Sequence, residues 1–324
     1  MRALQVTALS SDFSGCSLKE VATPEIGPGQ ILVRVEAASL NFPDLLMAQG
    51  LYQFKPELPF ILGMEVAGTV ERVGSPCAFK VGDAVVGTTR VGGFARYVAV
   101  DAHVLRPKPA NVSFAQAAAF GIAYLTAYVA LVRLGNLQRN QWLLVHGASG
   151  GVGLAAVDLG KALGARVIAA SGSPEKLDAI AARYAPDAIL DTSKPFRDEV
   201  KALTNGGADC IYDPVGGDIF DESTRCIAFG GKLLVVGFAS GRIPVISANM
   251  PLIKGFSVVG VRAGEFGRRF PELGHENLDA IWQMAAEGRL TPYVHCELPL
   301  GEWREALRLM SERKVTGKIV LRPE

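Results

Sequence analysis

The sequence has few of the residues that build metal clusters and disulfide frameworks. Its five cysteines include no C-x-x-C pair, and its four histidines, at positions 103, 146, 275 and 295, each stand alone. Scattered thiols usually pack as small apolar side chains in a reducing compartment. We therefore expect a cytoplasmic protein.

A strong net charge is also absent. The chain has 33 basic and 32 acidic residues, a formal charge of +1, so no overall field draws it to nucleic acid or to an anionic membrane. Its first residues lack the unbroken apolar stretch of a secretory signal. Residues 111–132 carry no charge and are long enough to span a bilayer, but polar side chains interrupt them, which favours a buried helix pair. We expect neither a nucleic-acid partner nor a membrane anchor.

The chain does have two different rhythms of secondary structure, as expected for 324 residues that fold into two domains. The first 110 residues favour short strands between glycine turns, at 31–39, 65–74, 83–89 and 95–100. From residue 141 strands alternate with helices. The strands are predicted at 142–147, 166–171, 188–191, 208–216, 231–238 and 257–262, the helices at 151–164, 174–184, 196–204, 220–228, 276–287 and 302–313, and a closing strand at 317–321. This pattern predicts an α/β protein with a distorted β-barrel or sandwich and a doubly wound parallel sheet.

A glycine-rich turn lies between the first of the alternating strands and its helix, in the sequence HGASGGVG at 146–153. Glycines let the backbone approach a ligand closely, and the first N–H groups of the following helix bind a pyrophosphate. The strand before the turn and the helix after it are the context that a dinucleotide site requires. The residues expected to contact the cofactor are Gly147, Ser149, Gly150, Gly151, Val152 and Gly153.

The end of the second strand indicates which nicotinamide cofactor binds. NAD sites usually have an acidic residue there that grips the ribose hydroxyls. This chain has no acid between Asp158 and Glu175, and it has Ser171 and Lys176 instead. Hydroxyl and ammonium groups attract a 2′-phosphate, whereas a carboxylate repels it. We predict NADPH rather than NADH; the alternative is a serine-capped turn beside a solvated lysine.

Motifs along nearly the whole chain resemble the medium-chain dehydrogenase/reductase superfamily, and within it the zinc-free quinone oxidoreductase branch that includes the zeta-crystallins. They are NFPDLLMAQGLY (41–52), PFILGMEVAGTVERVG (59–74), VGDAVVG (81–87), HGASGGVGLAAVDLGKALGARVIA (146–169), DPVGG (213–217) and GKIVL (317–321). The resemblance implies a GroES-like domain at 1–122, an NADPH-binding Rossmann domain at 123–261 and a return segment at 262–324 that completes the first domain. It also implies a homodimer.

The same resemblance bears on metal binding. Zinc-dependent relatives have a histidine ligand in a G-H-E motif, where this chain has Met64 before Glu65, and they have a cysteine where this chain has Asn41. Their lobe with four closely spaced cysteines is missing here. Because a thioether is a poor zinc ligand, we expect no metal.

An enzyme without a Lewis acid needs an acceptor that is already electrophilic, which indicates quinones or α,β-unsaturated carbonyls. The resemblance implies that Asn41 and Tyr52 line the substrate cleft as candidate hydrogen-bond donors, and that Thr126 faces the cofactor. Each has a structural alternative: a turn-stabilising amide, a stacking wall, and a helix hydroxyl bonded to its own backbone. Quinone reductases often have a second tyrosine where this chain has Leu46.

Three more residues, Val236, Gly237 and Phe238, end a strand of the parallel sheet. Open α/β sheets bind ligands at this position, so we expect them near the nicotinamide; the alternative is that they are strand core. Relatives also hold the 2′-phosphate with a tyrosine where this chain has Thr192, so Ser171 and Lys176 are expected to carry more of that contact.

Two other functions stay open beside NADPH-dependent reduction of quinones or enones. An enoyl reductase that acts on acyl-CoA or carrier-bound thioesters would use the same fold and cofactor. A crystallin-like protein would bind NADPH without turnover.

Overall fold

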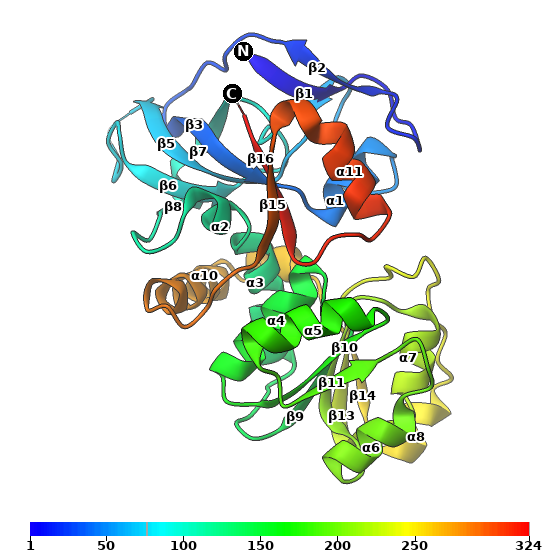
Figure 1. Ribbon diagram of the computed structural model, residues 1–324. Helices are drawn as coiled ribbons and strands as arrows, with labels where there is room; N and C mark the ends of the chain where they lie inside the picture. Colours follow the sequence, from blue (N-terminus) through cyan, green and yellow to red (C-terminus); the bar gives the residue numbers. More distant parts are fainter. Residues whose placement is uncertain (76, 324) are drawn as a thin grey trace. The chain divides into compact units, whose positions relative to one another are not determined.

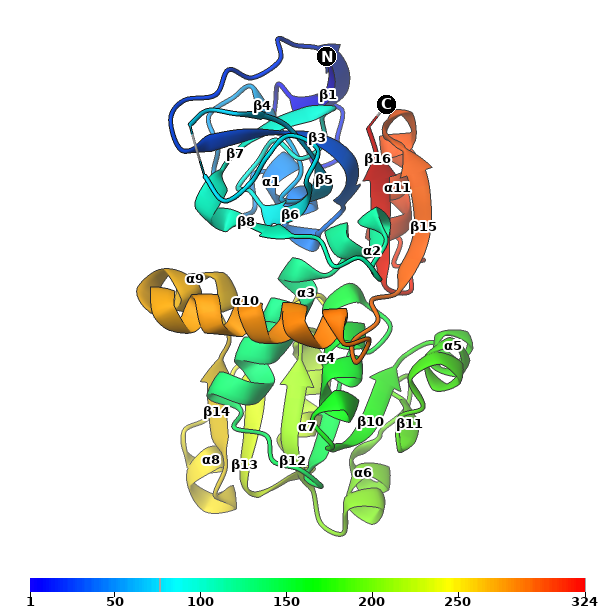
Figure 2. The ribbon, with the colours of Figure 1, turned by 90° about the vertical axis from the view of Figure 1, so that its left-hand side faces the viewer.

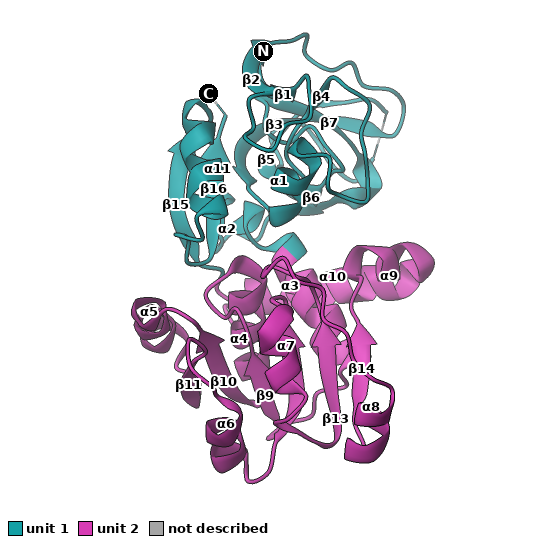
Figure 3. Cartoon of the chain, turned by 90° about the vertical axis from the view of Figure 1, so that its right-hand side faces the viewer, with its two compact units in different colours: residues 1–122, 292–324 teal, residues 123–291 magenta. Residues whose placement is uncertain are grey.

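The computed structural model describes residues 1–75 and 77–323, which divide into two compact units (Figure 3). Unit 1 comprises residues 1–122 and 292–324, and unit 2 comprises residues 123–291. The chain thus returns to unit 1 at Pro292 and not at the predicted residue 262. The reason is that α10 (Pro271–Ala286) packs within unit 2, where the Arg133 guanidinium donates a hydrogen bond to Asn277 Oδ1 at 2.6 Å.

Unit 1 is a β-rich domain built on two sheets (Figure 1). The larger sheet has the order β15-β16-β3-β5-β6-β8, with β7 also paired to β3, and the smaller has the order β2-β1-β4. The strands are β1 (Arg2–Val6), β2 (Cys16–Glu20), β3 (Gln30–Ser39), β4 (Phe60–Ile61), β5 (Glu65–Val73), β6 (Ala84–Thr88), β7 (Tyr97–Asp101), β8 (Leu105–Pro107), β15 (Val294–Pro299) and β16 (Lys318–Arg322). The helices are α1 (Phe42–Ala48), η1 (Ala102–Val104), α2 (Phe114–Ala118), η3 (Leu300–Glu302) and α11 (Trp303–Ser311).

Strand β3 is the spine of unit 1. It pairs with β5 along one edge and with β7 and β16 along the other, so most of its side chains are buried. The pairing of β16 with β3 brings Val320 opposite Ser39. The end of the chain therefore closes the sheet that its beginning starts.

Unit 2 is a parallel sheet with helices on both faces (Figure 2). Its strands run in the order β11-β10-β9-β12-β13-β14, so the chain winds outward from β9 in both directions. The strands are β9 (Trp142–Val145), β10 (Arg166–Ser171), β11 (Ala188–Asp191), β12 (Ala208–Asp213), β13 (Ile227–Val235) and β14 (Ser257–Gly260). The helices are α3 (Gly121–Tyr128), which begins at the unit boundary, η2 (Val129–Leu134), α4 (Gly151–Ala162), α5 (Pro174–Tyr184), α6 (Arg197–Thr204), α7 (Gly217–Ser223), α8 (Asn249–Lys254), α9 (Ala263–Arg269) and α10.

This strand order places a switch point between β9 and β12, where connections leave in opposite directions. In open parallel sheets, ligands bind at the carboxyl ends of the strands at such a point. The glycine-rich turn follows β9 and therefore lies at this position.

Two predicted elements of this region differ from the structure. The helix predicted at 220–228 ends at Ser223, and β13 begins at Ile227, four residues before the predicted strand. Ile227 pairs with Ala208 of β12, and this pairing places residues 227–228, which the sequence pattern predicts as helix, in a strand. Residues 111–132 form α2, α3 and η2, and no helix in residues 1–75 and 77–323 has the length and apolar surface to span a bilayer.

Candidate functional site

The glycine turn packs its backbone directly against the helix that follows. Gly147 has φ +55°, a conformation that favours glycine. A side chain at Gly153 would place its Cβ only 2.1 Å from the carbonyl oxygen of Gly147. The turn therefore keeps its shape only with glycine at position 153.

Helix α4 presents open backbone donors at the end of this turn. Its N-cap is Gly150, and none of the described side chains caps the helix. The first N–H groups of an α-helix have no partner within the helix, and its dipole makes that end positive. The half-buried residues Gly151 and Val152 thus bring backbone donors to a surface suited to an anion.

The segment that follows β12 contacts the glycine turn, and the segment that follows β13 lies beside it. A Cβ at Gly147 would lie within 3.3 Å of Pro214 and Val215, which follow β12. Asp213 accepts hydrogen bonds from the backbone of Val215 at 2.8 Å, and its own carbonyl accepts one from Val236 at 2.8 Å. Burial raises the pKa of the Asp213 carboxyl. The predicted segment 236–238 therefore lies beside the 213–217 turn, with Phe238 41% exposed.

The predicted phosphate-binding residues lie at the next strand. Ser149 Oγ and Ser171 Oγ are 3.5 Å apart, and the backbone of Ser173 donates to Ser171 Oγ at 3.3 Å. Lys176 lies in the first turn of α5, where a cation is unfavourable unless an anion is near. Partial burial lowers the pKa of the Lys176 ammonium. The structure thus brings Ser149 and Ser171 together and places Lys176 five residues further along the chain.

In unit 1 the amide of Asn41 is already engaged within the protein. Its Nδ2 donates to the carbonyl of Ser39 at 3.2 Å and to Glu65 Oε2 at 3.3 Å, which uses both amide hydrogens. Its backbone N–H donates to Asp44 Oδ2 at 2.8 Å. The side chain is buried. This geometry favours the turn-stabilising interpretation of Asn41 over donation to a substrate.

A buried lysine completes this group and was not anticipated as a site residue. Lys318 Nζ donates to Asn41 Oδ1 at 2.5 Å and lies 3.7 Å from Glu65 Oε2. Glu65 Oε1 accepts a hydrogen bond from the backbone of Ile122 at 2.8 Å. We name Asn41, Asp44, Glu65 and Lys318 the buried polar cluster. Its one signal in the sequence is a lysine at the head of the apolar run GKIVL.

Burial perturbs every charge of the buried polar cluster. It raises the pKa of Glu65 and lowers the pKa of Lys318, because a charged form loses its hydration. It also raises the pKa of Asp44 to about 7, although Asp44 accepts backbone hydrogen bonds from Asn41 and Gly63. The Lys318 ammonium and the Glu65 carboxylate stabilise each other's charged forms, because they lie close together inside the protein.

A zinc ion does not fit these residues. Met64 packs its thioether against the unit 1 core, and the Lys318 ammonium beside Asn41 and Glu65 repels a divalent cation. Within residues 1–75 and 77–323, no three His, Cys, Asp or Glu side chains are placed to hold a metal. His146 is buried, its Nε2 lies 2.8 Å from Ser223 Oγ, and burial lowers its pKa to about 3, which is the setting of a structural residue.

The other predicted catalytic residues are half-buried. Tyr52 packs against the core of unit 1, and its backbone N–H donates to the carbonyl of Leu46 at 3.2 Å. Thr126 belongs to α3 in unit 2. Tyr52 and the buried polar cluster therefore share a unit, whereas Thr126 shares one with the glycine turn.

Comparison with known proteins identifies the family. Residues 27–110 match the alcohol dehydrogenase GroES-like domain, and residues 151–279 match the zinc-binding dehydrogenase domain. A quinone oxidoreductase-like protein 2 homolog from Nematostella vectensis is 41% identical over 93% of this chain and 83% of its own length. The chain belongs to the medium-chain dehydrogenase/reductase superfamily. Its quinone oxidoreductase branch, predicted from the motifs, and its GroES-like and Rossmann architecture are confirmed.

Two further relatives of this medium-chain oxidoreductase are informative. The quinone oxidoreductase from Thermus thermophilus, solved alone and with NADPH, is 34% identical, with a TM-score of 0.87 over 99% of this chain and 100% of that one. Part of the mycoketide-CoA synthase of Mycobacterium tuberculosis is 35% identical over 93% of this chain, which corresponds to 7% of that protein. The matched family domain is described as zinc-binding, whereas Met64, Asn41 and Lys318 of this chain do not form a zinc site.

Proposed function

We propose that this protein is an NADPH-dependent oxidoreductase that reduces quinones or α,β-unsaturated carbonyls without zinc. The observation that carries the proposal is the open helix terminus at Gly151, with Ser171 at the end of β10 and Lys176 in the first turn of the following helix, α5. NADPH, when bound, supplies the hydride that the acceptor takes up.

Different residues of unit 2 bind different parts of the cofactor. The backbone N–H groups of residues 151–153 bind the pyrophosphate, and the absence of a side chain at Gly153 keeps the turn tight against the helix. The Ser171 hydroxyl and the Lys176 ammonium bind the 2′-phosphate. The segment 236–238 borders the nicotinamide, and Thr126 orients it.

The residues of unit 1 act on the acceptor. Tyr52 donates a hydrogen bond to the oxygen on which negative charge develops, and such donors act strongly when preorganised. Asn41 serves this chemistry indirectly, because its backbone N–H bonds to Asp44 at the start of α1 while its side-chain amide bonds to Glu65 in the buried polar cluster. Solvent supplies the proton.

A substrate screen tests the proposal. NADPH oxidation is followed with benzoquinones, larger quinones, small enones and enoyl thioesters as acceptors. We expect turnover with at least one quinone or enone. Tight NADPH binding without oxidation of any acceptor would indicate the crystallin-like alternative and contradict the proposal.

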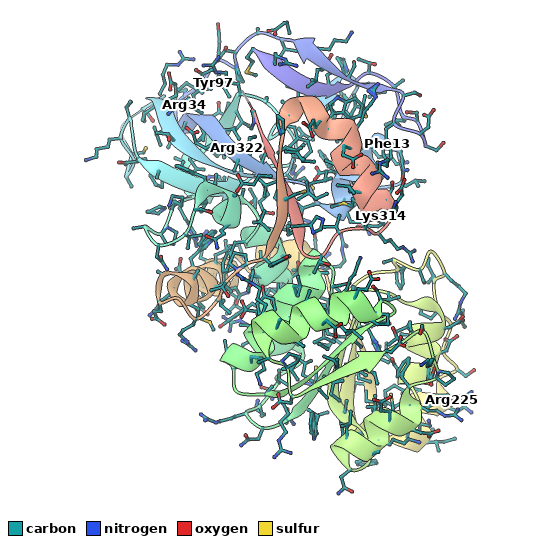
Figure 4. The ribbon with its side chains drawn as sticks, viewed as in Figure 1. Phe13, Arg34, Tyr97, Arg225, Lys314 and Arg322 are labelled. Atoms are coloured by element: carbon teal, nitrogen blue, oxygen red, sulfur yellow. The ribbon has the colours of Figure 1, made fainter. Side chains whose placement is uncertain are left out.

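Replacement of the tyrosine tests its role. We expect Tyr52→Phe to lower kcat/KM at least ~10-fold with the best acceptor, since a preorganised donor contributes several kcal/mol. The matched control is Tyr97→Phe in β7 (Figure 4), a half-buried tyrosine beside Arg96 that should leave kcat/KM unchanged. Unchanged kcat/KM in Tyr52→Phe with both a quinone and an enone would remove the tyrosine from the mechanism.

A second candidate function is reduction of enoyl thioesters. The match to part of mycoketide-CoA synthase favours it. Helix α9 also has two exposed arginines, Arg268 and Arg269, that share one carboxylate, Glu265, at 2.9 Å each, and the positive charge that remains suits the phosphates of coenzyme A. A kcat/KM for crotonyl-CoA above that for every quinone, lowered by Arg268→Ala, would select this candidate.

We also propose that the protein is a homodimer through the β14 edge of unit 2. β14 is the last strand of the sheet, and exposed apolar side chains flank it: Phe229 at 88%, Leu252 at 81% and Ile253 at 74%. Light scattering should give twice the chain mass for the native protein and for the control Ile189→Asp on the opposite edge strand. Leu252→Asp should be monomeric, and a native monomer would contradict the proposal.

A further inference from the structure

One carboxylate of unit 2 holds both passages of the chain between the units. The chain leaves unit 1 between residues 122 and 123 and returns to it between residues 291 and 292. Asp158 Oδ2 accepts a hydrogen bond from the Tyr124 hydroxyl at 2.6 Å and another from the backbone N–H of Thr291 at 2.8 Å. Its two partners thus stand at the first passage and at the second.

The position of Asp158 shows that these contacts are specific. It is 8% exposed in α4, in the apolar sequence GLAAVDLG, where a carboxylate without partners would be very unfavourable. Tyr124 is 2% exposed and close to its carboxylate, so this bond is shielded from water. Tyr184 adds a hydrogen bond from its hydroxyl to the carbonyl of Thr291 at 2.8 Å. Thr291 is therefore held on both sides of its backbone.

Asp158 also joins two parts of the proposed cofactor site. Helix α4 begins at the glycine turn, and α3 carries Thr126 two residues after Tyr124. Both elements are helical, so a bond between them fixes one with respect to the other over several turns. A single side chain thus bonds both chain passages and links them to the helix that follows the turn.

We propose that Asp158 is a positioning residue for hydride transfer, which anchors both chain passages, and Thr126 with them, to the helix that begins at the glycine turn. The proposal rests on the proposed function for its catalytic consequence only. The anchor itself depends on Tyr124, Asp158 and Thr291. A misplacement of about 1 Å at a reacting centre can lower a rate about 100-fold, so a loosened anchor should affect kcat more than binding.

Two variants test the anchor. Asp158→Leu keeps a side chain of similar size and removes both accepting oxygens, and Tyr124→Phe removes only the hydroxyl at the first passage. For both we expect the NADPH Kd to stay within about twofold while kcat falls about 10- to 100-fold. Backbone hydrogen exchange should accelerate at 122–126 in both variants and at 289–291 in Asp158→Leu, with the amides of β9 and β12 still protected.

The control is Tyr212→Phe in β12, which removes a buried tyrosine hydroxyl that has no hydrogen-bond partner within residues 1–75 and 77–323. It should leave exchange at 122–126 and at 289–291 as in the wild type. Unchanged exchange at 122–126 in Tyr124→Phe would overturn the proposal, as would acceleration spread evenly over unit 2. Hydrogen exchange needs no turnover, so an enzyme inactive with every acceptor would contradict the proposed function and leave the anchor to be judged on exchange alone.

Discussion

The buried polar cluster of unit 1 and the start of α4 in unit 2 use their polar groups in opposite ways. In unit 1 the buried polar cluster bonds to itself: Lys318 contacts Asn41 and Glu65, and Asn41 donates both amide hydrogens to protein acceptors. In unit 2 the start of α4 has no side-chain cap among the described residues. The first arrangement stabilises a scaffold, whereas the second leaves donors for a ligand.

The difference follows from the cost of burial. Charged side chains removed from water need partners inside the protein, so the cluster in unit 1 is closed. Backbone N–H groups at a helix terminus keep contact with solvent until an anion replaces it. A polar site that is already saturated is therefore weaker evidence for binding than an unsaturated helix terminus.

The largest effect is expected on the stability of unit 1 when the buried ammonium of Lys318 is removed. We expect Lys318→Met to lower the free energy of unfolding of unit 1 by about 3–5 kcal/mol, because it leaves the Glu65 carboxylate buried without its cation. Lys314→Met is the matched control (Figure 4), since Lys314 is exposed, pairs with exposed Glu312 and should change stability by less than about 1 kcal/mol. Denaturant unfolding followed by hydrogen exchange in β3 measures both.

A double variant separates lost charge balance from lost packing. Lys318→Met with Glu65→Gln removes both members of the pair and should recover part of the loss. Equal stability of Lys318→Met and Lys314→Met would show that the cluster does not stabilise unit 1.

A methyl group in the glycine turn of unit 2 should weaken the binding of NADPH at the start of α4. Gly153→Ala places a Cβ 2.1 Å from the Gly147 carbonyl oxygen, and overpacking of about 1–3 kcal/mol corresponds to an NADPH Kd about 5- to 150-fold higher. Gly264→Ala in α9 is the control, since its Cβ would meet only the end of the Arg268 side chain at 3.6 Å. Calorimetric titration measures both, and wild-type affinity in Gly153→Ala would refute the packing argument.

The pH dependence of stability should differ between the units. Asp44 has a pKa raised to about 7, so below that pH the folded state holds a proton that the unfolded chain releases above about pH 4. Its contribution to stability is therefore full below pH 4 and falls as pH rises to 7, by at most ~1.4 kcal/mol per pH unit. Asp44→Asn should remove this slope from unit 1, as measured by unfolding at pH 4, 5.5 and 7.

His146 provides the opposite sign in unit 2. Its pKa is lowered to about 3, so the unfolded chain binds the extra proton below about pH 6.5 and the contribution to stability falls as pH falls toward 3. His146→Gln should therefore flatten the profile in the other direction. Profiles that change in the same sense in both variants would contradict the assigned pKa directions.

The smallest effect is expected at the phosphate-binding lysine. Lys176→Ala should raise the NADPH Kd about tenfold, the value of one charge-assisted contact near solvent, and leave the NADH Kd unchanged. Lys161→Ala, which removes an exposed pair with Asp187, is the control and should alter neither constant. An equal loss of affinity for both cofactors in Lys176→Ala would argue against contact with the 2′-phosphate.

Local patterns were sufficient for most of unit 2. The alternation of strands and helices predicts the parallel sheet, and HGASGGVG predicts the turn, because both depend on residues close together in the sequence. The predicted boundaries of elements and units were wrong where contacts between residues far apart in the sequence determine them. Ile227 joined the sheet through Ala208, and residues 263–286 stayed in unit 2 through contacts such as that between Arg133 and Asn277.

The buried charges were beyond the sequence for the same reason. Lys318 contacts Asn41 across 277 residues of chain, and Asp158 contacts Thr291 across 133. Each appears as one charge in an apolar run, a pattern that fits a surface position equally well. Only the tertiary fold shows the partners of these charges. It also shows that the Asn41 amide is bonded within the protein, which favours a structural role over donation to a substrate.

Titration of the unmodified protein with NADPH and with NADH, side by side in a calorimeter, tests the central claim most directly. The open terminus of α4 together with Ser171 and Lys176 predicts that NADPH binds at least ~10-fold more tightly. Equal affinities, or tighter binding of NADH, would contradict the assignment of this edge of unit 2 to a phosphate-bearing nicotinamide.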